Sequence, residues 1–346
     1  MSDSNIYNIE AYDYDLPEDA IANEPAVPRD SCKLMVVNRK NDRVEHVIFR
    51  DIIKYLHPGD LLVLNDTKVI KARLFTRKPT GAKIELFLLR PYSDGTWEAM
   101  LRPAKKVKVP SVLMIDDISI RVVSRDGKIF KIYFEGMSFE DVLVFLDEKG
   151  IMPLPPYIKN GEKIAPEMYQ TVFAQKAGSV AAPTAGLHFT SELLQNIQEK
   201  GVSIGYITLH VGLGTFEPVR EEDIREHRIH SEYLEVPHSV VDMIIRTKES
   251  GKRVVAVGTT VVRALETAAI DIGVIKPFMG ESTLFIYPGY KFKIVDSLIT
   301  NFHLPKSTLL MLVSAFYDRE KILSLYKEAL KMGYKFFSFG DAMFLI

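Results

Sequence analysis

The sequence contains a single cysteine, Cys32, among its 346 residues. One thiol cannot form a disulfide within the chain, and it cannot supply the several thiolates of a structural zinc or iron–sulfur site. The first twenty residues lack the basic start and apolar stretch of a secretory signal. The longest apolar run, Thr308–Phe316, falls well short of the ~20 residues that span a bilayer. We therefore expect a soluble, cytoplasmic protein.

The chain also lacks an excess of either charge, since 44 Lys and Arg oppose 45 Asp and Glu and leave a formal net charge of −1. Any surface for nucleic acid must therefore be a local patch. Basic side chains gather near two aromatic residues, and we name five of them as candidate RNA-binding residues: Arg90, Arg102, Lys105, Lys106 and Lys108. Such side chains neutralise phosphates, and aromatic rings stack on unpaired bases. A solvated strand edge guarded by lysines accounts for the same pattern.

The residues that are present predict a folded protein of about two domains, by the rough guide of ~150 residues each. Short β-rich runs follow one another at Lys83–Arg90, Thr96–Arg102, Val112–Ile115, Ile118–Val123 and Ile129–Phe134. Asp94-Gly95 and Asp126-Gly127 suit tight hairpins, because glycine accepts a positive φ. This succession predicts a small antiparallel barrel or sandwich. The stretch Phe139–Lys149 after it predicts a helix that ends at Gly150.

Strands and helices alternate after the proline-rich stretch that begins at Met152. Predicted helices are Ser191–Lys200, Ser239–Ser250, Val261–Ile270 and Thr308–Phe316, and predicted strands are Ser203–Val211, Arg253–Gly258 and Thr283–Ile286. Such alternation favours a parallel or mixed sheet covered by helices. We predict an α/β fold, a mixed sheet flanked by helices, with an inserted small antiparallel β-barrel. Residues 1–73 and 151–346 would form a discontinuous catalytic domain, and 74–150 the inserted barrel.

Ligands of open α/β sheets bind beyond the carboxyl ends of strands, so we looked there first for chemistry. His210 ends one predicted strand and is followed by Gly212 and Gly214, which permit close approach of the backbone to a ligand. A dinucleotide-binding fingerprint would require glycine where Glu217 stands. A plain glycine turn beside a packed histidine explains the pattern equally well.

Two helix starts are candidate anion sites, because their free N–H groups and positive dipole end attract carboxylates and phosphates. Thr259 and Thr260 precede one helix, and Lys306 and Ser307 precede the other. The second lacks the glycines of a nucleotide-triphosphate loop. In both cases the hydroxyls could instead serve only as helix caps.

His188 lies in a loop just before a predicted helix, where the helix dipole favours the neutral base. A lone histidine is nevertheless more often structural than catalytic. The sequence contains no HExxH pair, so we expect no metal site.

Long, ordered motifs extend over nearly the whole chain. They are Tyr14–Pro17, Glu24-Pro25, Pro28–Asp30, Gly59–Thr67, Ala72–Leu74, Met152–Ile158, Tyr169–Ala174, Gly178–Thr190, Thr208–Phe216, Ala256–Thr260, Phe285–Tyr290, Thr300–Phe316 and Phe339–Met343. Together they resemble the S-adenosylmethionine:tRNA ribosyltransferase-isomerase family of queuosine biosynthesis. Lys68 and Phe173 depart from the family's usual arginine and tyrosine, but neither is a position that we assign to chemistry.

The resemblance implies an α/β domain with an inserted barrel, and it implies a reaction. S-adenosylmethionine would donate its ribosyl group to 7-aminomethyl-7-deazaguanine in the anticodon loop of tRNA, giving epoxyqueuosine-tRNA, adenine and methionine. S-adenosylmethionine is then a substrate, and no metal or redox cofactor is implied. A base must remove a C5′ proton beside the sulfonium, and a donor must assist the departing adenine.

Histidine suits both proton transfers at neutral pH. Our acid–base candidates are His188 and His210, followed by His303. The methionine carboxylate would be held by Thr259, Thr260 and Arg263, or by Lys306, Ser307 and Thr308, which we call the Lys306 group. Asp66 or Asp341 would bind the ribose hydroxyls or the substrate amine. The full set of substrate-binding candidates is Asn65, Asp66, Thr67, Tyr169, Gln170, Thr184, Gly186, Gly212, Gly214, Thr215, Thr259, Thr260, Arg263, Asn301, Lys306, Ser307, Thr308 and Asp341.

Two alternatives stay open at the level of the sequence. One is an RNA methyltransferase that uses the same cosubstrate, which the missing glycine-rich loop disfavours. The other is a non-catalytic RNA-binding protein whose histidines are structural. We expect no membrane partner and a monomeric protein.

Overall fold

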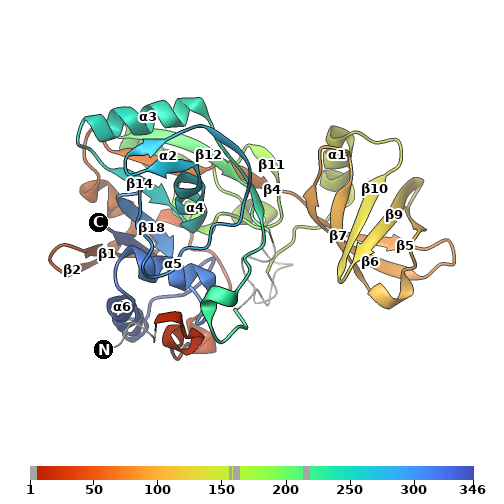
Figure 1. The fold of residues 1–346 in the computed structure, drawn as a ribbon, viewed down its shortest axis with the longest axis horizontal. Coiled ribbons are helices and arrows are strands. Elements are labelled where there is room, and N and C mark those ends of the chain that lie inside the picture. The colour runs from red at the N-terminus through yellow and green to blue at the C-terminus, as the bar shows by residue number, and fades with distance from the viewer. Residues whose placement is uncertain (1–5, 156–157, 159–163, 213–218) are drawn as a thin grey trace. The chain divides into compact units, whose positions relative to one another are not determined.

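The computed structural model describes residues 6–155, 158, 164–212 and 219–346. The chain divides into two compact units. Figure 1 colours the chain by residue number, so the barrel strands of unit 2 are orange to yellow. Unit 1 takes in residues 1–66, 156–174 and 183–346, and unit 2 takes in 67–155 and 175–182. The expected barrel segment, 74–150, lies within unit 2. That unit also includes β4 (Thr67–Val69) and β11 (Lys176–Ser179), which pair in parallel.

Unit 1 is built on a mixed sheet of nine strands in the described residues, in the order β17-β13-β12-β3-β14-β18-β19-β1-β2. Strands β12, β3, β14 and β18 run parallel, and antiparallel partners extend the sheet on both sides. The strand bounds are β1 Lys33–Asn38, β2 Arg43–Ile48, β3 Leu61–Asn65, β12 Ser203–Leu209, β13 Glu232–Val236, β14 Val254–Val257, β17 Phe278–Ser282, β18 Ser297–Asn301 and β19 Ala342–Leu345. The predicted fold class, a mixed α/β sheet with a β-barrel, is confirmed.

The central strands β3 and β14 are buried, and Asn65 at the end of β3 is their only polar residue. Every residue of β3 and of β14 is buried. Leu62, Leu64 and Val255 pack in one core with Leu193 and Ile197, which belong to helix α2 (Ser191–Glu199). Continuous apolar runs of this kind are typical of buried parallel strands.

The predicted helices are present, with ends that differ by one or two residues. They are α1 Phe139–Lys149, α3 His238–Glu249, α4 Thr259–Ala268 and α5 Thr308–Phe316. Helix α6 (Arg319–Lys331) was not predicted, although Asp318 caps its first turn by accepting from the N–H of Lys321. Strands β13 and β17 were also missed.

The predicted strand at Thr283–Ile286 is wrong, because β17 ends at Ser282. The N–H of Leu284 donates to the Ser282 hydroxyl, and the carbonyl of Leu284 accepts from the Arg263 guanidinium. These backbone groups bind side chains instead of a neighbouring strand, which ends the ladder there.

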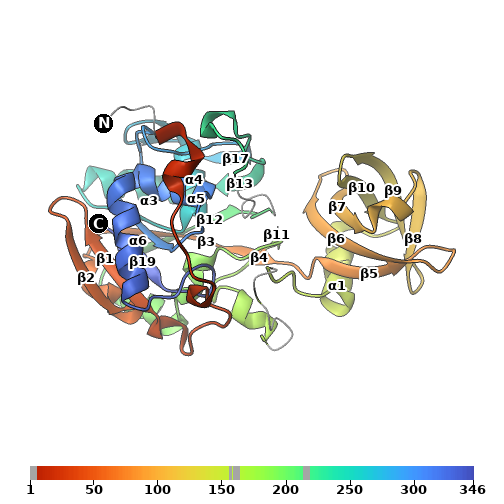
Figure 2. The same cartoon turned by 90° about the horizontal axis from the view of Figure 1, so that it is seen from below.

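Unit 2 contains a closed barrel in the order β10-β7-β6-β5-β8-β9. Its strands are β5 Arg73–Arg77, β6 Lys83–Pro91, β7 Trp97–Arg102, β8 Ser111–Ile115, β9 Ile118–Asp126 and β10 Ile129–Phe134. Each alternates buried and outward residues, as a strand with one wet face must. Helix α1, beside the barrel in Figure 2, contributes Val142, Phe145 and Leu146 to the barrel core.

None of the helices in the described residues is long and apolar enough to cross a membrane. Two very short strands, β15 (Ala269–Asp271) and β16 (Val274–Ile275), complete the regular structure.

Candidate active site

The parallel strands β3, β12, β14 and β18 of unit 1 end at one rim of the sheet. Each of them ends in, or is followed by, a polar residue or a glycine. Asn65 ends β3, His210 follows β12, Gly258 follows β14 and Asn301 ends β18. Carboxyl ends of adjacent parallel strands are where open α/β sheets bind ligands. We refer to this edge, with the residues just named, as the rim.

Asn65 connects three parts of the rim. Its side-chain oxygen accepts from the N–H of Leu209 at 3.0 Å, and its amide nitrogen donates to the Leu209 carbonyl at 3.0 Å. The same nitrogen lies 3.4 Å from the hydroxyl of Thr260. This buried amide thereby holds the end of β12 against the start of α4.

Helix α4 begins without a side-chain cap. Its N-cap is Gly258, at φ +91°, so Thr259 and Thr260 occupy the first two helical positions. The alternative in which these hydroxyls cap the helix is therefore not what the structure has. Only glycine adopts this φ readily, and a Cβ added at this position would lie 3.5 Å from the Ala185 Cβ. The helix thus starts with its N–H dipole end at the rim.

His188 lies in a buried hydrogen-bond network beside the rim. Its Nε2 is 3.1 Å from the amide nitrogen of Asn301, and its Nδ1 is 3.1 Å from Sγ of Cys32. The Asn301 nitrogen also donates to the Phe337 carbonyl, and the Asn301 oxygen accepts from Thr184. Because that nitrogen can only donate, Nε2 must accept, and the ring proton therefore lies on Nδ1 toward sulfur.

Burial also fixes the charge of this ring. Desolvation, together with the positive charge of Arg29, lowers the pKa of His188 to about 4. The imidazole is therefore neutral near pH 7, as a base must be, but both of its nitrogens are occupied. His188 can accept a proton only after Asn301 moves away from Nε2.

A small hollow is lined by both His188 and Arg29. The Arg29 guanidinium donates to the carbonyls of Glu167 and Gln170 at 2.5 Å each. Phe337, whose carbonyl binds Asn301, has φ +74°, which is uncommon for an aromatic residue and marks a strained backbone. The hollow is lined by Pro25, Ala26, Arg29, Met168, Leu187, His188, Ser338 and Phe339.

His303 is buried as well, just past the end of β18. Its Nε2 is 2.9 Å from the Thr300 hydroxyl, its N–H donates to Tyr326, and its carbonyl accepts from Tyr14. Desolvation lowers its pKa to about 3. This ring is locked within the core, which argues for a structural role.

His210 differs from the other two histidines because its side chain is half-buried. The ring stacks on Tyr233, with centroids 5.7 Å apart and planes 19° from parallel. Its backbone N–H donates to the Tyr233 carbonyl at 3.0 Å. This ring is therefore less buried than those of His188 and His303.

The family of this chain follows from comparison with known proteins. The sequence model of the family described as queuosine biosynthesis protein matches residues 9–345. S-adenosylmethionine:tRNA ribosyltransferase-isomerase of Sulfurihydrogenibium sp. is 55% identical over 340 residues, with 97% of this chain and 98% of the relative covered. The enzyme of the same name from Staphylococcus haemolyticus is 50% identical over 346 residues, covering 98% and 100% of the two chains.

The chain belongs to the queuosine biosynthesis protein family. A crystal structure titled S-adenosylmethionine tRNA ribosyltransferase from Thermotoga maritima is 41% identical, covers 97% of this chain and 100% of its own, and superposes with a TM-score of 0.57. Similarity thus extends over the whole length of the relatives.

In this member of the queuosine family, Arg263 of helix α4 is buried and pairs with the buried Glu232. Its guanidinium donates to Glu232 and to the Leu284 carbonyl. Glu232 in turn accepts from the N–H of Gly212 at 3.1 Å, so one buried carboxylate connects α4 with the glycine turn after β12. Glu232 balances the charge of Arg263, while the second terminal nitrogen of this guanidinium is buried and has no hydrogen-bond partner among the described residues.

The Lys306 group also differs from expectation. Lys306 pairs with Glu10 at 2.8 Å and with Asp13 at 3.1 Å on the surface. Ser307 caps α5 by accepting from the N–H of Leu310, and Thr308 is the first buried residue of that helix. The capping alternative accounts for this helix start.

Asp66 and Asp341 have different surroundings. Asp66 accepts from the Thr208 hydroxyl at 2.7 Å, close to Asn65. Asp341 accepts from the backbone N–H groups of Lys33 and Lys335, and burial nevertheless raises its pKa. Asp341 therefore shapes the backbone beside Cys32, whereas Asp66 lies at the rim.

The remaining substrate candidates lie around these groups or outside the described residues. Gly186 packs so closely that a Cβ there would be 2.8 Å from Phe173. Tyr169 and Gln170 lie near Arg29, and Tyr169 packs on Phe339. Thr67 belongs to unit 2. Gly214 and Thr215 fall in 213–218, which the structure does not describe.

The five candidate RNA-binding residues separate into two places on the barrel. Arg90 forms a double hydrogen bond with Glu98 and a contact with Tyr92 near the β6–β7 turn. Arg102 pairs in register with Glu85, about five residues away along β6, which corresponds to ~17 Å of strand. Lys105, Lys106 and Lys108 follow Arg102 and are exposed.

Three residues of the site escaped sequence reasoning: Cys32, Arg29 and Glu232. Arg29 falls within the matched Pro28–Asp30 motif and could have been singled out there. Among the described residues, no group of three or more His, Cys, Asp or Glu side chains could hold a metal ion.

Proposed function

We propose that this chain is an S-adenosylmethionine:tRNA ribosyltransferase-isomerase. It transfers and isomerises the ribosyl group of S-adenosylmethionine onto 7-aminomethyl-7-deazaguanine in tRNA, giving epoxyqueuosine-tRNA and releasing adenine and methionine. The observation that carries the proposal is 50–55% identity over nearly the full length with relatives of that name. The rim, with its hydrogen-bonded polar side chains, is the part of unit 1 where we propose that the reaction takes place.

The reaction needs a base close to C5′ of the nucleoside. The base removes a C5′ proton, the neighbouring sulfonium stabilises the carbanion, and the bond from ribose to adenine then breaks. We assign the base to His210 first, because its half-buried ring is accessible from the rim. His188 comes second, because Asn301 must first leave its Nε2. His303, held inside the core, is assigned a structural role.

The methionine part of the substrate carries a carboxylate, which suits the uncapped start of α4. The first-turn N–H groups and the hydroxyls of Thr259 and Thr260 lie there, and helix N-termini stabilise anions. We assign to Asp66 the role of accepting from the ribose hydroxyls, because it lies beside Asn65 and already accepts from the Thr208 hydroxyl. No resident metal or cofactor enters this scheme, and S-adenosylmethionine is consumed as a substrate.

The tRNA substrate would present its target base from a single-stranded loop, where exposing a base costs only roughly a few kcal/mol. The exposed basic residues of the barrel, Arg102, Lys105, Lys106 and Lys108, are our candidates for contacting its backbone. Arg90 is removed from that set because Glu98 neutralises it. We propose a cytoplasmic enzyme that acts as a monomer.

Product analysis tests the reaction. The purified protein is incubated with S-adenosylmethionine and tRNA carrying the aminomethyl base, and the small molecules are separated by chromatography. We expect adenine and methionine in equal amounts, matched by modified tRNA. S-adenosylhomocysteine would instead identify a methyltransferase, and no turnover with retained tRNA binding would identify an RNA-binding protein.

A variant tests the base. His210→Ala should lower kcat by 10²-fold or more, the usual contribution of a general base, with tRNA affinity changed only a few fold. His238→Ala, at an exposed position on α3, is the matched control and should retain full turnover. Unchanged turnover in His210→Ala would remove His210 from the mechanism.

A further inference from the structure

The outer face of strands β5, β6 and β7 carries an exposed aromatic ring among unpaired cations. Phe75 on β5 is 64% exposed, although the barrel core lies directly beneath its neighbours Leu74 and Thr76. Single exposed apolar residues are common on protein surfaces, so the meaning of Phe75 depends on the side chains around it.

The register places the cations around that ring. Arg77 lies opposite Lys83, Phe75 opposite Glu85, and Glu85 opposite Arg102. Adjacent strands are about 4.8 Å apart, and outward residues repeat every ~6.6 Å along a strand. The backbone positions of all three cations therefore lie within roughly 10 Å of that of Phe75.

None of these three cations is bound by a carboxylate of the described residues, although Glu85 lies opposite Arg102. In the part of the chain that the structure describes, Arg77, Lys83 and Arg102 form no ion pair. The acids of the three strands are Glu85, which pairs with Arg73, and Glu98, which pairs with Arg90. The face thus keeps a net positive charge around Phe75.

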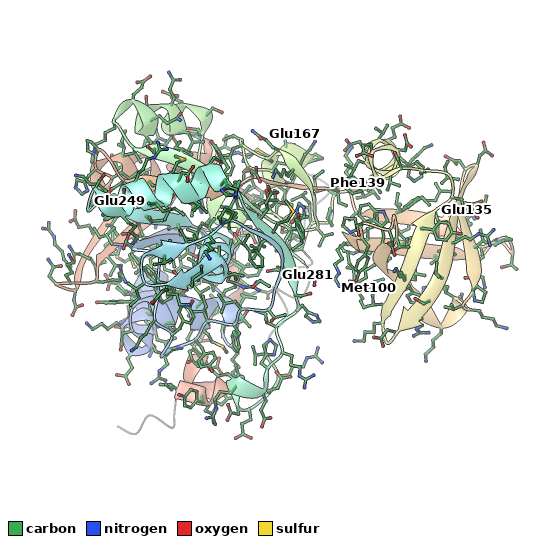
Figure 3. All side chains as sticks on the ribbon, turned by 45° about the horizontal axis from the view of Figure 1, so that its top comes forward. Met100, Glu135, Phe139, Glu167, Glu249 and Glu281 are labelled. Carbon is green, nitrogen blue, oxygen red and sulfur yellow. The ribbon has the colours of Figure 1, made fainter. Side chains whose placement is uncertain are left out.

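More basic residues continue the face at the same end of the barrel. Lys78 donates to the carbonyl of Lys106 at 2.8 Å, which ties the β5–β6 turn to the segment after β7. Lys105, Lys106 and Lys108 are exposed there. Next to Phe75, the outward residues Phe87 and Met100 are opposite one another, and Met100 is labelled in Figure 3.

We infer that this face, defined by Phe75, Arg77, Lys83 and Arg102, binds a single-stranded segment of the tRNA, with an unpaired base stacked on Phe75 and phosphates on the three cations. The inference rests on the proposed function for the identity of the RNA. An aromatic ring on a β-surface with flanking cations is the arrangement by which β-sheet and barrel modules bind single strands. A folded acidic protein would offer the cations carboxylates, but it would offer the ring no flat π-partner.

Binding of a labelled tRNA transcript to the full-length protein tests the inference, measured by fluorescence anisotropy. Phe75→Ala should weaken binding about 10-fold, because stacking contributes ~1–3 kcal/mol per base. Phe75→Trp should bind within about 2-fold of wild type. Phe75→Leu, which is apolar but has no ring, should weaken binding as Phe75→Ala does.

The charges are tested by salt dependence. Arg77→Ala/Lys83→Ala should weaken binding and reduce the slope of log affinity against log salt by about 1.5, because each phosphate contact contributes ~0.7–0.9. The matched double variant Arg125→Ala/Lys128→Ala, at exposed positions near the β9–β10 turn, should change the slope less. Val123→Ala, an exposed apolar residue on β9, is the control for Phe75→Ala.

The outcomes separate this inference from the proposed function. Wild-type protein that binds tRNA and releases adenine, together with a Phe75→Ala variant of unchanged affinity, would overturn this face and leave the reaction intact. If the Phe75→Leu variant bound tRNA with wild-type affinity, a base stacked on the Phe75 ring would be ruled out. Selective loss in the Phe75→Ala and Arg77→Ala/Lys83→Ala variants, with normal adenine release at saturating tRNA, supports the inference.

Discussion

At the scale of single residues, His188 is a candidate base whose two ring nitrogens are both occupied by hydrogen-bond partners. Its Nε2 accepts from Asn301, its Nδ1 faces Cys32, and its ring packs at 5.0 Å from Phe49. The neutral form is enforced by burial. The His188 ring is thus neutral but has both nitrogens occupied, whereas the His210 ring is half-buried.

Acid sensitivity follows from the two buried histidines. The pKa of His188 is lowered to about 4 and that of His303 to about 3, against ~6.5 in an unfolded chain. Between pH 6.5 and about 4 the unfolded chain binds protons that the folded one does not. Stability is therefore complete above pH 6.5 and falls with acidification, by about 1.4 kcal/mol per pH unit for each histidine.

Urea unfolding measured from pH 7 to 4.5 checks this. His188→Gln and His303→Gln should each reduce the slope of stability against pH by about that amount. His230→Gln, at an exposed position, should leave the slope unchanged. Slopes equal to wild type in both core variants would contradict the assignment of neutral, desolvated rings.

Asn301 should contribute strongly to stability through its partners. Asn301→Leu has similar volume but leaves His188 Nε2 without its donor and the Thr184 hydroxyl without its acceptor. We expect a loss of about 1–3 kcal/mol for buried groups left unsatisfied, measured by thermal unfolding. Asn196→Leu, exposed on α2, should change stability by under about 0.5 kcal/mol; equal effects would argue against the network.

At the scale of elements, two helices that looked alike in sequence begin differently. Ser307 caps α5 with its hydroxyl, whereas α4 begins after Gly258 with no side-chain cap. The difference depends on the φ of Gly258 and on the approach of Ala185, which no local pattern encodes. Helix α4, whose first N–H groups have no side-chain cap, is the helix that begins at the rim.

Substitutions should separate these two helix starts. Ser307→Ala should cost about 1 kcal/mol of stability and leave the KM for S-adenosylmethionine unchanged. Thr260→Ala should raise that KM several fold with little loss of stability. Lys306→Ala removes only a surface pair and should affect neither quantity by much. A raised KM in Lys306→Ala, with Thr260→Ala normal, would move the carboxylate site to α5.

Much of the element pattern could be predicted from the sequence, because alternation and Asp-Gly turns are local signals. The barrel strands from β6 to β10 and helices α1 and α5 follow from them. Partners distant in sequence could not be predicted. Cys32 of the segment before β1 contacts His188 across 156 residues, and Glu232 of β13 contacts Arg263 of helix α4 across 31 residues. The sequence around Arg263 therefore did not indicate its acidic partner.

At the scale of the whole molecule, each unit has its own core. Trp97, the only tryptophan, is buried in the barrel and stacks on Phe139 with centroids 5.7 Å apart. Its fluorescence therefore reports on unit 2, while far-ultraviolet circular dichroism reports on both units. A ligand of unit 1 should stabilise unit 1 by about 2.7 kcal/mol at one hundred times its Kd.

Thermal unfolding with both probes tests this independence. Saturating S-adenosylmethionine should raise the midpoint of the dichroism transition that belongs to unit 1 and leave the Trp97 fluorescence midpoint in place. A ligand-free sample serves as the reference. A single transition in which both probes shift together would show that the two cores unfold as one cooperative unit.

The central claim is that the rim formed by the ends of β3, β12, β14 and β18 binds S-adenosylmethionine. Hydrogen–deuterium exchange of the full-length protein, with and without saturating S-adenosylmethionine, tests it directly. We predict slower exchange in the segments 184–188, 209–212, 258–262 and 301–303, with barrel strands unchanged. Bound ligand with protection confined to other segments would contradict the claim.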